Sequence, residues 1–132
     1  MPERVTFEYT VIRIVPRVER AEFLNAGVVL VCRSRRFLGA RVELDRARLD
    51  CFAPWLDDAF VSTVEDQLLL IPRIAAADPS AGPIAQLDFR ERFHWLAAPS
   101  STVLQASPAH TGLCSDPAAQ LDKLFAGLVR IR

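Results

Sequence analysis

The sequence predicts an α+β fold, in which a small, predominantly antiparallel sheet of about four strands is packed by three or so helices. Three observations predict it. Segments with a period of two come first along the chain, a tight turn joins two of them, and amphipathic segments with helical spacing dominate the second half. Of the 132 residues, 51% are hydrophobic and 24% are charged, so the chain is expected to fold as one domain over residues 1–132.

The first expected strand begins at Val5 and ends before Pro16. Apolar and polar side chains alternate from residue 5 to residue 11, and continuing that alternation places Arg13 on the apolar face. An unpaired buried charge is costly. Arg13 is therefore expected to form an ion pair at the strand end, to extend its guanidinium into solvent along an apolar surface, or to bind an anion from a rigid position on the sheet.

A hairpin is expected next. Residues 27–32 are apolar on both faces and residues 38–44 alternate again, so the short basic stretch between them should be the turn. A solvated turn is the plainer interpretation of Arg33, Arg35 and Arg36. The alternative is a small anion-binding patch that includes Arg36.

Helices follow in the middle of the chain. Asp45 can cap a short helix over residues 46–52, and apolar side chains three and four apart over residues 60–71 predict an amphipathic helix. Pro72 is expected to kink that helix or to end it near Leu70, because proline lacks a backbone N–H.

The last third of the chain predicts two more helices with a strand between them. Asp88, with Glu91 three residues later, is placed to cap a short helix. Residues 102–106 are a brief run of β-branched and apolar side chains, which predicts a strand. Asp116 followed by Pro117 marks the start of the final helix. The strand is expected to return to the sheet.

The stretch from Ser107 to Ser115 is expected to be a loop between that strand and the final helix. Free N–H groups at a helix start favour an anion, and Thr111, Gly112 and His110 could complete such a site. As an enzyme, the protein would use His110 as general acid or base, with Ser107 or Thr111 assisting. The plainer interpretation is a capped turn that only connects two elements. The glycine spacing matches neither a P-loop nor a dinucleotide fingerprint.

A second candidate lies in the sequence FLNAGVVL, where Asn25 precedes the first residue of the apolar strand by two positions. Its amide could hold the histidine loop or a ligand. A plain turn leading into the strand is the alternative.

Charge and composition exclude several classes of function. A formal net charge of zero and a pI near 6.7 argue against nucleic-acid binding as a function of the whole domain. Three well-separated cysteines and the lack of a signal peptide or long apolar run predict a cytoplasmic protein with reduced thiols and no membrane association. Two histidines, His94 and His110, are too few for a predicted metal site, and no motif assigns a cofactor.

Four segments together resemble a known family: EFLNAGVVLV, FLGARVEL, RFHWLAAPSSTVLQASPAHTGL and DPAAQLDKLF. They resemble the bacterial domain-of-unknown-function family 3037 from Tyr9 to Phe125, in the same order. The asparagine–glycine pair before the second strand and the Ser-Pro-Ala-His-Thr-Gly stretch are the most specific features. Ala109 stands where a bulkier β-branched residue is expected.

The resemblance implies no activity, cofactor or catalytic residue. It implies an accessory or regulatory role, because family members are often encoded beside kinases that resemble the high-persistence toxin type. The leading hypothesis is a non-catalytic binding domain for such a kinase-like partner or for a small anionic ligand, using Arg13, Asn25, Arg36, His110 and the residues after it. The alternative is a small enzyme acting on a phosphate-containing or acyl substrate.

Overall fold

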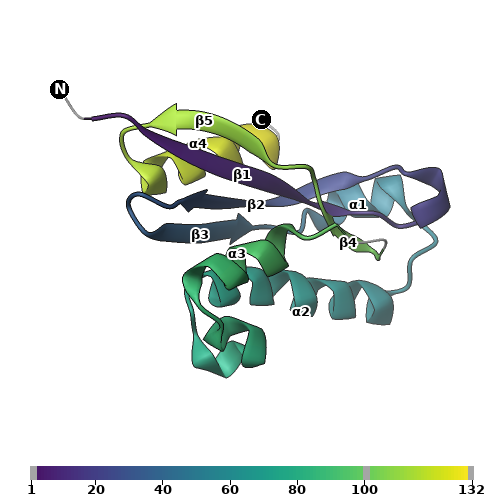
Figure 1. Ribbon diagram of the computed structural model, residues 1–132. Helices are drawn as coiled ribbons and strands as arrows, with labels where there is room; N and C mark the ends of the chain where they lie inside the picture. Colours follow the sequence, from purple (N-terminus) through teal and green to yellow (C-terminus); the bar gives the residue numbers. More distant parts are fainter. Residues whose placement is uncertain (1–2, 100–101, 131–132) are drawn as a thin grey trace.

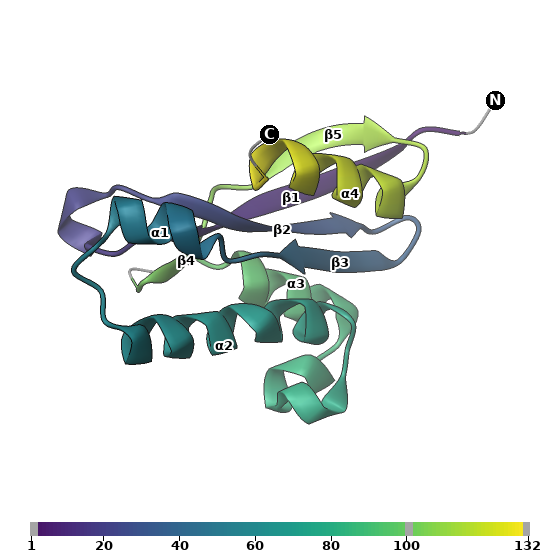
Figure 2. The ribbon, with the colours of Figure 1, turned by 180° about the vertical axis from the view of Figure 1, so that it is seen from behind.

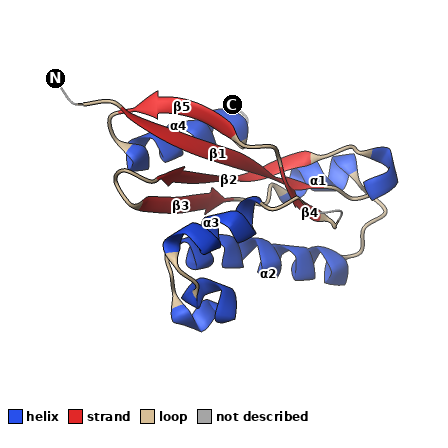
Figure 3. Ribbon diagram, in the orientation of Figure 1, coloured by secondary structure: helices blue, strands red, loops and turns tan. Residues whose placement is uncertain are grey.

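The computed structural model describes residues 3–99 and 102–130, and within them it shows a five-stranded antiparallel sheet with helices on both faces (Figures 1 and 3). The α+β prediction is confirmed. The strands are β1 (Val5–Ile14), β2 (Leu24–Cys32), β3 (Phe37–Val42), β4 (Leu104–Ala106) and β5 (His110–Cys114). The helices are α1 (Arg46–Phe52), α2 (Asp58–Ala75), α3 (Phe89–Ala97) and α4 (Pro117–Leu128), with short 3-10 turns at Val18–Arg20, Pro79–Ala81 and Pro83–Gln86.

The long strand β1 lies at the centre of the sheet. One of its edges pairs with β2, which in turn pairs with β3. Its other edge is shared between two strands: β5 pairs with residues 5–9 and β4 with residues 12–14. Figure 1 shows β5 and β4 following one another along that edge.

Each face of the sheet packs against its own helices. On one face, Ile12 and Ile14 of β1 join a buried cluster with the apolar sides of α2 and α3. On the other face, Phe7 joins a second cluster with Leu121 and Phe125 of α4. Figure 2 shows α4 lying in front of the sheet when it is seen from behind. The period of two in β1 therefore separates two cores, as alternating side chains in a strand do.

The predicted helix caps are confirmed. The side chain of Asp45 accepts the backbone N–H of Arg48, and that of Asp88 accepts the backbone N–H of Glu91. Asp116 caps α4 in the same way, with Pro117 at the first helical position.

Of the two alternatives for Pro72, an end of the helix near Leu70 is wrong, because α2 begins after the cap residue Asp57 and continues through Pro72 to Ala75. The missing N–H of Pro72 removes one hydrogen bond near the end of the helix. Burial of Ile74 and Ala75 against the core offsets that loss, since each is less than 5% exposed.

The prediction of a loop from Ser107 to Ser115 is also wrong, because most of it forms β5. The short sequence HTGLC gains its backbone partners from β1, about a hundred residues earlier in the chain. In the described parts of the chain, none of the helices combines the length and the apolar character needed to cross a bilayer.

Candidate functional site

The predicted site residues are divided between the two faces of the sheet. Residues directly opposite each other on neighbouring strands share a face. His110 lies opposite Tyr9 and Gly112 opposite Phe7, which places both on the face covered by α4. Thr111 lies opposite Glu8 and therefore on the face covered by α3.

Ser107 is fully engaged in holding the sheet together. Its side-chain Oγ accepts the backbone N–H of Val11 at 2.8 Å, and its hydroxyl donates to the carbonyl of Pro108 at 2.9 Å. The hydroxyl of Thr10 donates to the carbonyl of Ser107 at 2.6 Å. With only 2% of Ser107 exposed, its hydroxyl serves the connection between β4 and β5.

His110 lies on the surface, beside an aromatic ring. Its ring centroid is 5.2 Å from that of Tyr9, with an angle of 32° between the ring planes. Within the part of the chain that the structure describes, no hydrogen bond joins His110 to Ser107 or Thr111. The three candidate catalytic residues are therefore not arranged as a nucleophile and its base.

Gly112 is required for close packing and does not need a positive φ. A Cβ atom at this position would lie 2.7 Å from a ring carbon of Phe7. The N–H groups at the start of α4 are also occupied, because the carboxylate of Asp116 accepts those of Ala118 and Ala119 at 3.1 and 3.3 Å. The chain thus supplies its own anion at this helix start.

Arg13 and Asn25, in contrast, are brought together. They lie opposite each other on β1 and β2, next to an irregularity in which one extra residue of β2 is accommodated. The side-chain amide of Asn25 donates to the carbonyl of Leu128 at the end of α4, at 3.1 Å. Gly27 permits the tight packing nearby, since a Cβ atom there would lie 2.7 Å from a methyl group of Val42.

Both of these side chains leave polar atoms unsatisfied. Nε of Arg13 and Oδ1 of Asn25 are buried and have no hydrogen-bond partner among the described residues. The guanidinium carbon of Arg13 lies 4.0 Å from the centroid of the Phe23 ring, which is a cation–π contact. No acidic side chain in the described ranges pairs with Arg13.

Two exposed apolar side chains flank this arrangement. Phe23 is 43% exposed and Leu128 is 37% exposed. We call the surface formed by Arg13, Phe23, Asn25 and Leu128 the Arg13 patch. The sequence patterns did not single out Phe23, which lies directly before β2 and belongs to no strand.

Arg36 lies elsewhere, where the β2–β3 turn meets the start of α3. It lines a polar pocket of about 370 Å³ together with Arg33, Asp88, Phe89 and Arg90. A neighbouring pocket of about 420 Å³ includes Arg33, Glu8 and Thr111. Arg36 and Thr111 are therefore linked through Arg33, on the face opposite the Arg13 patch.

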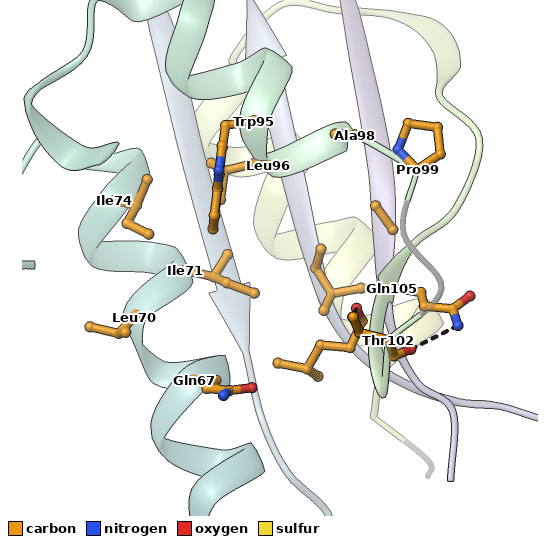
Figure 4. Close-up of a pocket in the computed structure, with 13 residues that line it drawn as sticks. Gln67, Leu70, Ile71, Ile74, Trp95, Leu96, Ala98, Pro99, Thr102 and Gln105 are labelled. Atoms are coloured by element: carbon orange, nitrogen blue, oxygen red, sulfur yellow. Dashed lines mark hydrogen bonds between the residues drawn. The ribbon is translucent and has the colours of Figure 1, made fainter. Parts of the chain in front are cut away.

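A third cavity, of about 520 Å³, lies between α2, α3 and β4 (Figure 4). Ile71 and Ile74 line it from α2, and Leu96 and the half-exposed Trp95 line it from α3. Gln105 closes the opposite side, where its amide donates to the carbonyl of Thr102 at 2.8 Å. The described residues that line this cavity carry no charge, so the cavity adds no ionic group to the Arg13 patch or to the pocket lined by Arg36.

Metal-ligating residues do not gather in the described ranges, where no group of three or more His, Cys, Asp or Glu side chains could hold an ion. The family model described as "Protein of unknown function (DUF3037)" matches residues 9–129. Neither the search of curated proteins nor that of solved structures gave a match.

Proposed function

Since the chain belongs to the DUF3037 family, whose description assigns no activity, we propose from the geometry that it is a non-catalytic domain that binds a partner protein through the Arg13 patch. The observation that carries this proposal is the Arg13 guanidinium, held over Phe23 without an acidic partner among the described residues.

The composition of the patch supports recognition of a protein. Arginine and aromatic side chains are enriched among the residues that dominate interface energetics, and here they stand beside a half-exposed leucine. The ring of Phe23 holds the guanidinium of Arg13 in one orientation before binding, so less side-chain entropy is lost when a partner binds.

The guanidinium of Arg13 defines what the partner should offer. Its Nε is buried, but the residue as a whole is only partly buried and no acidic side chain among the described residues pairs with it. A carboxylate or carbonyl oxygen of the partner would accept hydrogen bonds from the terminal N–H groups of this guanidinium, and hydrogen bonds to a charged group are worth about 1.5–3 kcal/mol.

A catalytic role receives less support. The hydroxyl of Ser107 is buried and engaged, and Thr111 lies on the other face from His110. The kinase-like protein that the family resemblance implies is the first partner to test, and the expected cytoplasmic location belongs to the same proposal.

The experiment is co-expression with the kinase-like neighbour in a bacterial cytoplasm, followed by calorimetric titration of the purified proteins. We expect a complex at micromolar concentration, weakened about tenfold or more by Arg13→Gln and by Phe23→Ala. Arg20→Ala is the matched control, because Arg20 is ion-paired with Glu22 and lies outside the patch.

Two results would count against the proposal. One is the absence of any complex at micromolar concentration. The other is equal weakening by Arg20→Ala and Arg13→Gln, which would indicate only a general charge effect. Thermal unfolding of each variant establishes that a loss of binding does not follow from a loss of structure.

A further inference from the structure

We propose that the pocket lined by Arg33, Arg36, Asp88, Phe89 and Arg90 binds a phosphoryl group. We call it the arginine pocket. It lies where the β2–β3 turn meets the start of α3 and is separate from the partner surface proposed above, so either function can fail without the other.

The pocket brings together segments that are far apart in the sequence. The turn is closed by a hydrogen bond from the backbone N–H of Arg36 to the carbonyl of Arg33, at 3.1 Å. The α3 side contributes Phe89 and Arg90, directly after the cap residue Asp88. This open pocket of about 370 Å³ can hold a phosphoryl group together with part of the molecule that carries it.

Aromatic rings hold two of the guanidiniums in place. The guanidinium carbon of Arg36 is 5.3 Å from the centroid of Phe89, and that of Arg33 is 5.6 Å from the centroid of Phe93. Stacking of this kind leaves the N–H edge of the Arg36 guanidinium free, and that edge matches two oxygens of a phosphoryl group.

Charge distinguishes a phosphoryl group from a single carboxylate. Arg33 is ion-paired with Glu8, whereas Arg36 and Arg90 have no ion pair or hydrogen bond from their side chains within the described residues. Three arginines and Asp88 line the pocket, so its lining is net positive and attracts a phosphate monoester, which carries about −1.5 to −2 at neutral pH, more strongly than a single carboxylate. Asp88 offsets part of this positive charge, because its carboxylate interacts electrostatically with Arg90.

The backbone at Arg36 supplies a way to test the pocket. Its φ of 47° lies in the left-handed region, as do those of Ala21 and Ala77, and glycine adopts this region without strain. Replacing Arg36 by glycine therefore removes the guanidinium while keeping the turn.

The test is a titration of the labelled protein followed by NMR at constant ionic strength. The probes are inorganic phosphate, phosphoserine and adenosine monophosphate, with acetate for comparison. We expect saturable shifts in the amides of residues 33–36 and 88–91 with the phosphorylated probes, and weak, non-saturating shifts with acetate. The order of affinity among the three phosphorylated probes identifies the source of the phosphoryl group.

Two variants and one control complete the experiment. Arg36→Gly and Arg90→Ala should each weaken binding of the best probe by about fivefold or more, because each removes one guanidinium. Arg36→Gly should not lower the unfolding temperature, since it relieves the backbone at that position. Arg20→Ala, which removes an exposed arginine outside the pocket, should leave the affinity unchanged.

Three outcomes would overturn the proposal. The first is a set of phosphate-induced shifts spread over arginines throughout the surface without saturation. The second is acetate binding as tightly as phosphoserine. The third is unchanged affinity in Arg36→Gly and Arg90→Ala, both of which are surface substitutions that should leave the fold intact.

Discussion

The side-chain oxygen of Ser107 accepts the backbone N–H of Val11, so a serine completes the ladder along β1 where β4 gives way to β5. Ser107→Ala should therefore destabilise the fold by about 1–3 kcal/mol, because it leaves a buried N–H without a partner. Chemical denaturation measures this change. Ser115→Ala is the control, since this exposed serine uses only its backbone carbonyl in a bond to Arg35. Equal stability of the two variants would show that Ser107 has no such structural role.

Gly112 should not tolerate a side chain. Its Cβ would lie 2.7 Å from the ring of Phe7, so Gly112→Ala should cost about 1–3 kcal/mol by overpacking. Gly127→Ala in α4 has open space and should instead stabilise the helix by up to about 1 kcal/mol. In the double variant Phe7→Leu with Gly112→Ala, the combined loss should be smaller than the sum of the single losses. Strictly additive losses would contradict the contact.

The three cysteines should differ in reactivity. Cys51 is exposed, whereas Cys32 and Cys114 are buried. Burial raises the pKa of the Cys114 thiol above its usual value, which lowers the fraction of reactive thiolate at neutral pH. A maleimide reagent should therefore label Cys51 rapidly in the folded protein and the other two only after unfolding, as intact mass spectrometry can show. Rapid labelling of Cys51→Ser would contradict this order.

Asp88 should make stability depend on acid pH. The backbone N–H of Glu91, which donates to its carboxylate, lowers the pKa of Asp88. A lowered pKa means that the stabilisation is present above the ordinary pKa and is lost as the pH falls below about 4. Asp88→Asn retains a capping side chain but cannot titrate.

The stability difference between the wild type and Asp88→Asn should therefore shrink when urea unfolding is repeated at pH 3 instead of pH 6. A difference that does not change with pH would contradict the role of the charged carboxylate. The same variant removes the negative charge that Asp88 contributes to the described lining of the arginine pocket, so it should also bind inorganic phosphate more tightly than the wild type.

The fold was predictable wherever a signal is local. Asp45, Asp88 and Asp116 cap helices because a carboxylate next to free N–H groups is favourable whatever the rest of the chain does. The α+β class followed from three local patterns, which are the alternation of the first strands, the tight turn between two of them and the helical spacing in the second half of the chain, and the face of Arg13 followed from the alternation. The strand β5 was missed because HTGLC has weak strand preference by itself, and its pairing with β1 supplies what the segment lacks.

The candidate site was less predictable because it depends on register. Once His110 and Thr111 lie in a strand, neighbouring positions must face opposite sides of the sheet, which divides the residues that a loop could have gathered. The meeting of Arg13 with Asn25 depends on an irregularity between β1 and β2 that no local pattern encodes. Likewise, only the tertiary packing of α3 against the sheet brings Arg90 near Arg36.

The division of one β1 edge between β4 and β5 has a consequence for synthesis on the ribosome. Residues 5–14 emerge long before residues 104–114, which complete their hydrogen bonding. A nascent chain can form the β1–β2–β3 sheet early, but the outer edge of β1 stays open to other strands until the later segment arrives. Translation halted before residue 104 therefore leaves an open sheet edge prone to aggregation, and the final native state forms only after that segment docks.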